Sequence, residues 1–213
     1  MKSLYFTSTG IEKQAEALIE DIQAQRPEKI TISHPALLVL DMQEYFLHPD
    51  SHAFVPSAPV ILPRVVALIK AFQQAGLPVI FTQHINTSQN AGMMSEWWRE
   101  MITPDHPLAG LHPNLPVENE KIIQKTQYDA FLGTELDSWL QKFCADEIVI
   151  TGVMTHLCCE STARAGFMRG YRVWFCADGT ATYNLDFHLA SLRNLAHGFA
   201  IPVLTTEIIG AVS

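Results

Sequence analysis

Short apolar runs rich in β-branched residues recur along the chain, and segments with the 3.6-residue periodicity of amphipathic helices precede or separate most of them. The runs predicted as strands are 36–40, 78–82, 121–124, 147–151, 172–176 and 201–205. The helical patterns are 10–25, 60–75, 134–143, 158–169 and 187–196. This alternation is typical of a parallel sheet whose crossover helices cover both faces. We therefore expect an α/β fold with three layers in αβα order around a doubly wound sheet of about six parallel strands.

The length of the chain favours a single core. Its 213 residues stay within the roughly 250 residues that one core reaches before chains divide into domains. We expect a helical extension over residues 1–30, formed by the pattern at 10–25, and one domain over residues 31–213. The extension is expected to pack on that domain or on a neighbouring subunit.

Composition and charge exclude several classes of protein. Hydrophobic residues make up 48% and charged residues 17% of the chain, which is too apolar for disorder, yet no run reaches the roughly 18 apolar residues that span a membrane. The first residues lack the pattern of a secretory signal, so we expect a cytoplasmic protein. A net charge of −8 argues against a nucleic-acid partner, because phosphate backbones bind clustered Lys and Arg. The four cysteines lack the paired spacing of a zinc site or a disulfide scaffold.

Cys158 is the first candidate for chemistry. It lies between the run 147–151 and a helical pattern, where the positive end of the helix macrodipole is expected to lower the pKa of its thiol. A free cysteine is more often a small buried hydrophobe, and we interpret Cys144 and Cys176 in that way. Cys159 points about 100° away from Cys158 on a helix, and a disulfide between these neighbours would be strained. Position therefore favours Cys158 as a nucleophile.

Two further polar residues follow predicted strands. Asp41 comes directly after the run 36–40, and Lys125 directly after the run 121–124. The carboxyl ends of parallel strands form the edge where doubly wound sheets bind ligands. A lone Asp there is more often a turn or a helix cap, but Asp41, Lys125 and Cys158 together have complementary chemistry. The carboxylate can accept the thiol proton, and the ammonium stabilises both the carboxylate and the developing thiolate.

The surroundings of this set supply candidates for an oxyanion hole and a pocket. The turn at 153–155 offers backbone N–H groups, each of which can stabilise an oxyanion by about 3 kcal/mol. The long segment 84–120 carries several Trp and Met residues, and we interpret it as a lid or pocket wall or, equally, as an oligomer contact. The candidate pocket residues are Gln43, Phe46, Gln83, Trp97, Thr155 and His156.

Three motifs in a fixed order carry a resemblance to a known family. They are LVLDMQ at 38–43, Lys125 with YDAF at 128–131 and GTEL at 133–136, and GVMT at 152–155 with Cys158 and TA at 162–163. Over residues 35–206 the chain resembles the isochorismatase-like cysteine hydrolases, which include nicotinamidases, N-carbamoylsarcosine amidohydrolases and ureidoacrylate hydrolases.

The resemblance implies a role for each member of the set. Asp41 is expected to act as general base and acid, Lys125 as its electrostatic partner and Cys158 as the nucleophile. A cis peptide bond between Val153 and Met154 is also implied, and it would aim the amides of Met154 and Cys158 into an oxyanion hole. Members of the family commonly form dimers or tetramers, so we expect a homo-oligomer.

The chain also departs from the pattern of some relatives. Metal-dependent nicotinamidases carry Asp-x-His after the second strand, whereas residues 82–86 supply His84 without that carboxylate. His48, Asp50 and His52 have ligand-like spacing, but a solvated polar loop is the favoured interpretation. We therefore expect no metal and no cofactor. Some isochorismatases carry Gly in place of Cys158 and cleave a vinyl ether without a covalent intermediate, so the thiol favours amide chemistry.

These observations predict a cysteine hydrolase that cleaves a C–N bond of a small amide or carbamoyl compound through a thioester on Cys158. Two alternatives stay open. An isochorismatase-type ether hydrolase would use Asp41 as the acid and leave the thiol idle. A redox-sensing or binding module would oxidise Cys158 and Cys159, but it has no need of Asp41 and Lys125. Substrate identity depends on the shape of the segment 84–120, which the sequence does not give.

Overall fold

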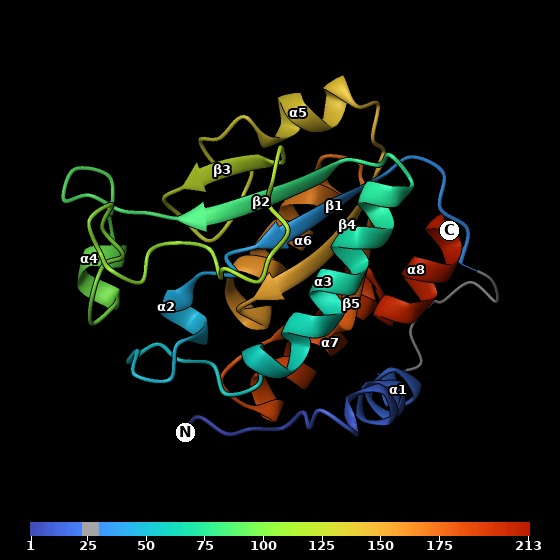
Figure 1. The fold of residues 1–213 in the computed structure, drawn as a ribbon, viewed down its shortest axis with the longest axis horizontal. Helices are drawn as coiled ribbons and strands as arrows, with labels where there is room; N and C mark the ends of the chain where they lie inside the picture. Colours follow the sequence, from blue (N-terminus) through green and yellow to red (C-terminus); the bar gives the residue numbers. More distant parts are fainter. Residues whose placement is uncertain (23–29) are drawn as a thin grey trace.

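The computed structural model of the chain describes residues 1–22 and 30–213 (Figure 1). Its strands form one sheet in the order β3-β2-β1-β4-β5-β6, and all neighbouring pairs are parallel. The strands are β1 (Pro35–Leu40), β2 (Val79–His84), β3 (Lys121–Lys125), β4 (Glu147–Val153), β5 (Arg172–Ala181) and β6 (Ile201–Val203). The predicted doubly wound sheet of six parallel strands is confirmed.

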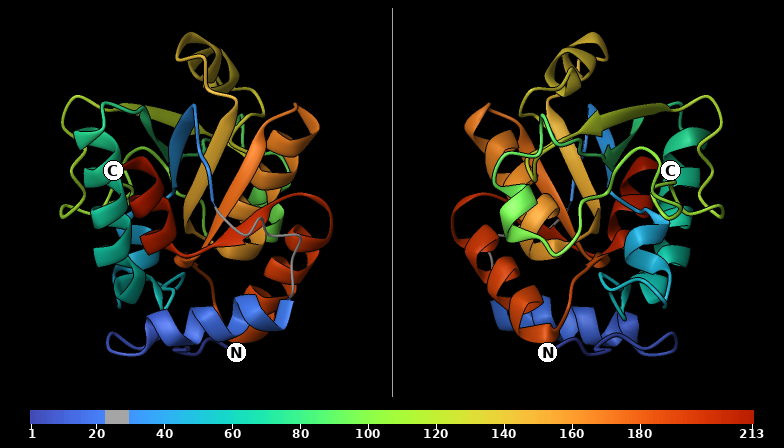
Figure 2. Two further views of the ribbon diagram at one scale, coloured as in Figure 1. Left: turned by 90° about the vertical axis from the view of Figure 1, so that its right-hand side faces the viewer. Right: turned by 90° about the vertical axis from the view of Figure 1, so that its left-hand side faces the viewer.

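Helices cover both faces of the sheet. They are α1 (Ile11–Ile22), α2 (Glu44–Leu47), α3 (Ala58–Gln74), α4 (Met94–Trp97), α5 (Leu136–Lys142), a π-helical turn η1 (Thr155–Cys159), α6 (Glu160–Met168), α7 (Leu185–Gly198) and α8 (Thr205–Val212). Figure 2 shows α3 and α8 on one face of the sheet and α6 and α7 on the other, and each pair of helices is in contact. The predicted three layers in αβα order are confirmed.

Several element boundaries differ from the prediction, and the strand predicted at 172–176 continues to Ala181. The strand predicted at 201–205 ends at Val203, because Thr205 begins α8 instead. The buried Asp178 carboxylate accepts hydrogen bonds from the backbone N–H and the hydroxyl of Thr205, at 2.7 and 2.8 Å, and so starts that helix. The helix predicted at 158–169 is preceded by η1, whose wider turn is a feature often found at functional sites.

The N-terminal segment packs on the domain. α1 contacts β5 and α7. Phe6, Ile11, Ala15 and Ile19 belong to the same buried core as the sheet. Residues 23–25 of the helix predicted at 10–25 lie outside the described residues.

The strand order places a crevice at the carboxyl ends of β1 and β4. The chain builds outward from β1 through β2 and β3, and then returns to the other side of β1 with β4. Such a switch point is where open α/β sheets bind ligands. The short helices α2 and α4 lie at this end of the sheet (Figure 1).

β1 and β4 approach closely at Gly152. This residue pairs with Leu40 in the register of the two strands. Its φ is 114°, and a Cβ built on it would lie 2.1 Å from the carbonyl oxygen of Leu40. Only glycine fits there, because it tolerates this backbone conformation and has no side chain.

We expect Gly152→Ala to lower the free energy of unfolding by about 3 kcal/mol or more, because the added methyl group overlaps the β1 backbone in a strained conformation. Urea denaturation followed by circular dichroism measures the change. Gly198→Ala is the matched control, since no atom lies within 4 Å of a Cβ added there. Equal stability of the two variants would contradict the prediction.

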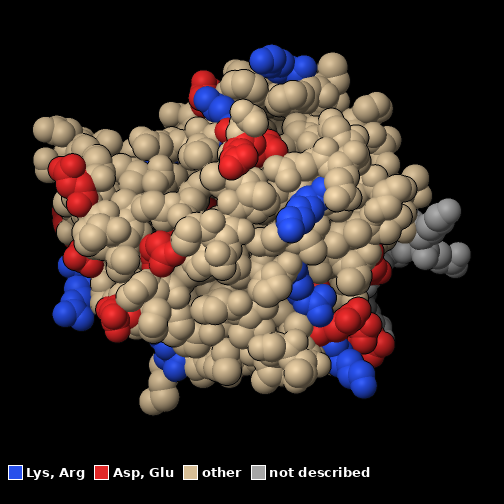
Figure 3. Space-filling model, in the orientation of Figure 1, with Lys and Arg blue, Asp and Glu red and all other residues tan. Residues whose placement is uncertain are grey.

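None of the helices among residues 1–22 and 30–213 is both long and apolar enough to span a membrane. On the face shown in Figure 3, Lys and Arg lie scattered among Asp and Glu. This face therefore offers a phosphate backbone no cluster of basic side chains.

Candidate active site

Neighbouring strand ends bring four polar side chains together. Asp41 follows β1, His84 ends β2, Lys125 ends β3, and Cys158 lies in η1 shortly after β4. His84 and Lys125 are register partners of β2 and β3. The carboxyl ends of parallel strands share one edge, so these residues meet although they are far apart in the sequence. Asp41, Lys125 and Cys158 form the predicted triad-like arrangement.

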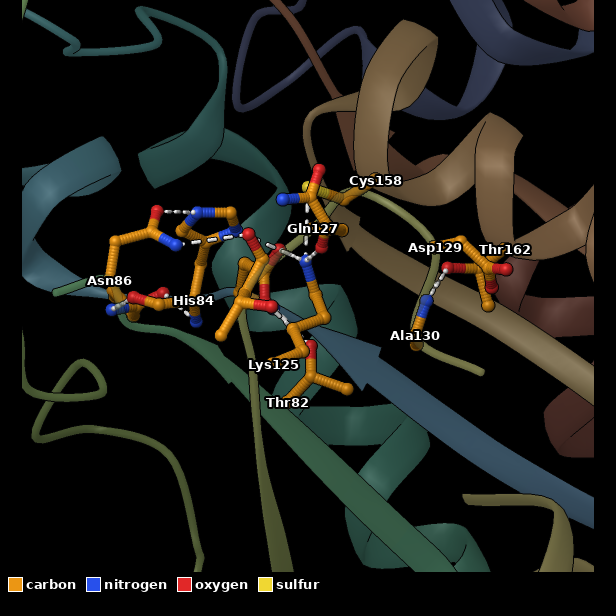
Figure 4. A network of polar contacts seen from close by, with 12 residues as sticks. Thr82, His84, Asn86, Lys125, Gln127, Asp129, Ala130, Cys158 and Thr162 are labelled. Carbon is orange, nitrogen blue, oxygen red and sulfur yellow. Dashed lines mark hydrogen bonds and ion pairs between the residues drawn. The ribbon is translucent and has the colours of Figure 1, made fainter. Parts of the chain in front are cut away.

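A buried ion pair lies at the centre of the site. Nζ of Lys125 is 2.7 Å from Oδ2 of Asp41, and both side chains are fully buried. The ammonium also donates to the Gln127 carbonyl at 2.9 Å and contacts Sγ of Cys158 at 3.4 Å (Figure 4). The Thr82 hydroxyl donates to Oδ1 of Asp41 at 2.6 Å. Each carboxylate oxygen therefore has its own partner, which fixes the orientation of the group.

The thiol of Cys158 faces the site, whereas that of Cys159 faces the core. A carboxylate oxygen of Asp41, a ring nitrogen of His84 and Sγ of Cys158 all lie within 4.8 Å of one another. Cys158 lines a cavity. Cys159 is fully buried in the hydrophobic core, and both cysteines are free. The two neighbours thus have separate surroundings, as their positions on a helical turn require.

The ion pair shifts the pKa values of its members in opposite directions. Burial is the largest single effect on Asp41 and favours its neutral form, but the Lys125 ammonium and the other polar groups around the carboxylate together outweigh it and lower the pKa of the carboxyl below its ordinary value of 3.8. Burial also disfavours the charge on Lys125, but the Asp41 carboxylate raises the pKa of that amine to about 12. Both groups are therefore charged across the neutral range.

The Cys158 thiol has a raised pKa. Burial, followed by the negative charge of Asp41, raises it to about 12. The prediction that the helix macrodipole lowers this pKa is therefore wrong, because the desolvation of a buried thiolate is the larger effect. At neutral pH the sulfur carries its proton, and the Asp41 carboxylate is the base beside it.

His84 belongs to the same cluster, although its sequence context singled it out only as part of an incomplete metal motif. Its Nε2 lies 2.7 Å from Oδ1 of Asn86, and its Nδ1 lies 3.5 Å from Nζ of Lys125. Burial and then the Lys125 charge lower the pKa of His84 to about 4. Asp41 and Lys125 were predicted from their positions at the carboxyl ends of strands. His84 could have been predicted in the same way, because it is the last residue of β2.

A small cavity lies beside the sulfur. Its volume is about 30 Å³, which is room for about two water molecules. Segment 84–120 supplies most of the wall. The peptide bond between Val153 and Met154 is cis, and Met154 also faces this space. The principal apolar lining residues are Phe46, Met94, Trp98, Met101, Tyr128 and Met154.

Of the six predicted pocket residues, Phe46 lines this cavity and the other five lie elsewhere. Trp97 is 79% exposed. Its neighbour Trp98 faces the cavity instead, and Nε1 of Trp98 donates to the Tyr128 hydroxyl at 2.9 Å. Adjacent residues on a helical turn point about 100° apart, so only one of the two tryptophans can face the site.

The two predicted glutamines hold a loop at the rim. Gln43 and Gln83 both donate to the Ala109 carbonyl, at 2.7 and 2.8 Å. Gln43 also accepts from the backbone N–H of His84 and donates to its carbonyl. They shape the site by fixing the backbone around it.

Thr155 and His156 do not line the cavity and instead anchor η1 through contacts with residues outside it. Oγ1 of Thr155 lies 3.0 Å from Nδ1 of the buried His188. Nδ1 of His156 lies 2.6 Å from Oγ1 of Thr182. The Tyr5 hydroxyl lies 3.1 Å from the same nitrogen of His188. The N-terminal arm therefore takes part in holding the turn that carries Cys158.

Metal-ligating residue types converge at one place in the part of the chain that the structure describes. They are Asp41, His84 and Cys158. Nζ of Lys125 lies among them, 2.7 Å from the carboxylate, 3.5 Å from the imidazole and 3.4 Å from the sulfur. The ammonium takes the position that a cation would need, so this arrangement does not fit a metal ion.

The fold and the motifs recur in known proteins. The isochorismatase domain matches residues 35–207 of this chain. Nicotinamidase 3 from Arabidopsis thaliana is 38% identical over 78% of this chain and 82% of its own length. Enterobactin synthase component B from Escherichia coli (strain K12) is 27% identical over 83% of this chain, which spans 62% of that protein. A cysteine hydrolase from Pseudomonas syringae pv. phaseolicola 1448A has a TM-score of 0.81 at 26% identity, covering 87% of this chain and 98% of that structure.

The fold and the site thus define a hydrolase with a three-layer fold and a six-stranded parallel sheet. A buried acid, amine and thiol lie at the switch point of that sheet. The chain belongs to the isochorismatase family, because the domain match covers most of its length. The predicted family resemblance is confirmed.

We expect Lys125→Met to lower the free energy of unfolding at pH 7 by about 3 to 5 kcal/mol, because it leaves the Asp41 carboxylate buried and unpaired. Adding Asp41→Asn should restore part of this loss, since the amide carries no charge. Without Lys125 the folded-state pKa of Asp41 rises above its unfolded value, so the loss is full at neutral pH and shrinks as the pH falls. Denaturant unfolding of the wild type, Lys125→Met, Asp41→Asn and the double variant at pH 7 and pH 5 tests this. If the losses of unfolding free energy in the two single variants simply add up in the double variant, the energetic coupling of Asp41 and Lys125 is contradicted.

Proposed function

We propose that this protein hydrolyses a C–N bond of a small amide or carbamoyl compound through a thioester on Cys158. The observation that carries the proposal is the position of the Cys158 sulfur at the cavity. It lies within 4.8 Å of an Asp41 carboxylate oxygen and 3.4 Å from the Lys125 ammonium. A nucleophile, its base and a stabilising cation thus lie within a few ångströms of one another.

In the first half of the reaction, the thiol proton moves to Asp41 and the sulfur forms a bond to the carbonyl carbon. Oδ2 of Asp41 has the ammonium as its ion-pair partner but no well-aligned hydrogen bond from the described residues, so it can accept this proton. The carbonyl oxygen becomes an oxyanion, for which the backbone amides of Met154 and Cys158 are the proposed donors. Collapse of the intermediate breaks the C–N bond, and the nitrogen takes the proton from Asp41 as it leaves.

In the second half, water hydrolyses the thioester. The Asp41 carboxylate takes a proton from the water as its oxygen bonds to the acyl carbon. The C–S bond then breaks, and the thiolate takes the proton back from Asp41. Lys125 keeps its charge in both halves and stabilises the thiolate while Asp41 is neutral. The site returns to its starting state, and the products are a carboxylic acid, or a carbamic acid from a carbamoyl compound, and ammonia or an amine.

The relatives and the cavity wall support a small, flat amide as substrate. Nicotinamidase 3, at 38% identity, is named for an amide. The aromatic side chains of Phe46, Trp98 and Tyr128 line the cavity and suit a planar molecule. A space of about 30 Å³ is too small for an aromatic amide, so we expect the wall formed by segment 84–120 to move as substrate enters.

We also propose that the protein assembles into a dimer or tetramer. Met93 and Trp97 lie on the segment that walls the cavity and are 64% and 79% exposed. Large apolar side chains at the surface are typical of contacts between chains.

We expect Cys158→Ala to abolish ammonia release from nicotinamide and other small amides, because no other group in the site can form the thioester. Mass spectrometry of the wild-type protein during turnover should detect an acyl adduct on Cys158. Cys144→Ser is the control, since Cys144 lies outside the site and is exposed, contrary to the prediction that it is buried. Full ammonia release by Cys158→Ala would contradict the thioester mechanism.

The pH dependence of kcat/KM follows from the separated pKa values of base and nucleophile. Asp41 is a carboxylate above its lowered pKa, and Cys158 is a thiol up to about pH 12. We therefore expect kcat/KM to stay constant from about pH 5 to pH 9 and to fall only at a pH below the ordinary carboxyl pKa of 3.8, where protonated Asp41 no longer accepts the thiol proton. Circular dichroism at each pH separates this loss from unfolding. A half-maximal point between pH 6 and pH 8 would contradict the assignment.

A further inference from the structure

One side chain at the reacting atoms has no role in the steps above. His84 lines the cavity beside Cys158 and is 8% exposed. One of its ring nitrogens lies within 4.8 Å of both the Cys158 sulfur and a carboxylate oxygen of Asp41. It ends β2 and pairs with Lys125 in the sheet (Figure 4), so its position is fixed by the backbone.

The hydrogen bonds of His84 fix its tautomer. Oδ1 of Asn86 can only accept a hydrogen bond, so Nε2 of His84 at 2.7 Å must donate to it. The orientation of the Asn86 amide is fixed in turn, because its Nδ2 donates to the Thr126 carbonyl at 3.0 Å. The second nitrogen of the ring, Nδ1, therefore carries a lone pair and no hydrogen.

This lone pair is available to a ligand. The ring is neutral because burial lowers the pKa of His84 to about 4. Nζ of Lys125 donates to Nδ1 only at 3.5 Å, whereas it donates to the Gln127 carbonyl at 2.9 Å. A hydrogen bond of that length is weak, so a closer N–H of a bound substrate can replace it.

We propose that His84 is a catalytic residue of this hydrolase, and that its Nδ1 accepts a hydrogen bond from the nitrogen of the scissile C–N bond. The inference rests on the proposed function and specifies the bond that the site recognises, which is one whose leaving group carries an N–H. An N–H held by Nδ1 turns the nitrogen lone pair toward the proton on Asp41. The nitrogen takes that proton as the C–N bond breaks, and His84 neither gains nor loses one.

Nicotinamide and methyl nicotinate are the probes that test this role, because they differ only in the leaving group. The ester oxygen has no hydrogen to donate to Nδ1. We expect His84→Leu to lower kcat/KM about 100-fold for the amide and less than about fivefold for the ester, since kcat/KM reports the steps up to the thioester. His84→Asn, which returns an acceptor oxygen near the position of Nδ1, should recover part of the loss on the amide. Equal losses on both probes, or none, would overturn the proposal.

Two controls accompany this comparison. His34→Asn changes a histidine whose side chain is 64% exposed and which precedes β1 at the opposite end of the sheet, and it should leave both rates unchanged. Mass spectrometry of His84→Leu with methyl nicotinate should still detect the acyl adduct on Cys158. If the adduct forms and kcat/KM falls equally on the amide and the ester, only the role of His84 is disproved. If no adduct forms in the wild type or in any variant, the thioester mechanism itself is disproved.

Side-chain NMR tests the tautomer without any substrate. In ¹H–¹⁵N correlation spectra of the imidazole groups at pH 7, the signal that disappears in His84→Leu should show hydrogen on Nε2 and none on Nδ1. A hydrogen on Nδ1 would leave no acceptor toward the cavity, and the proposal would then be wrong whatever the protein hydrolyses.

Discussion

The buried ion pair between Asp41 and Lys125 is the interaction on which the rest of this site depends. Neither charge would be stable alone in the interior, because desolvation of one ion costs several kcal/mol that only a close partner offsets. At 2.7 Å the two groups meet this need. The pair also fixes the geometry of its neighbours, since the ammonium donates hydrogen bonds to Gln127, Cys158 and, at 3.5 Å, His84. Removing either ion would disturb the polar contacts that it makes with Thr82, Gln127, Cys158 and His84.

The pair also decides how the thiol works. A low pKa is the usual explanation for a reactive cysteine, and the turn before α6 suggests it. Here burial and the Asp41 charge keep the proton on the sulfur. In the mechanism that we propose, nucleophile and base are therefore activated together, by a proton transfer inside the site when a carbonyl is present. In that mechanism the thiol stays protonated between turnovers, and the ammonium is the main stabiliser of the thiolate when it forms.

The frame around the site extends well beyond the motifs. η1 is held through Thr155 and His188 by Tyr5 from the N-terminal arm, which lies outside the matched domain. Gln43 and Gln83 secure the loop at Ala109 on the opposite rim. Polar residues near a catalytic cluster thus divide into those that face the cavity and those that hold the backbone behind it. Only the first kind is expected to contact substrate.

The sequence by itself determined the layout of the fold and the location of its chemistry. Alternating strand and helix patterns require a parallel sheet, and parallel strands bring their carboxyl ends to one edge, so Asp41 and Lys125 could be assigned to the site from their places after apolar runs. His84 and Thr82 lie in the last three residues of β2, so the same argument from strand ends applies to them. In the sequence, however, His84 looks like part of an incomplete metal motif, and Thr82 looks like an ordinary strand residue. Their importance appears only once Asp41 is beside them.

The tertiary structure alone decided the quantities that depend on surroundings. Burial, which no local pattern gives, reversed the predicted direction of the Cys158 pKa shift. The path of the segment 84–120 decided that Trp98 rather than Trp97 faces the cavity, because the direction of a side chain depends on where its short helix begins. The partners of His84 decided its tautomer. Sequence periodicity records which elements form and in what order, whereas charge, protonation and orientation arise from contacts between residues that the folded chain brings together.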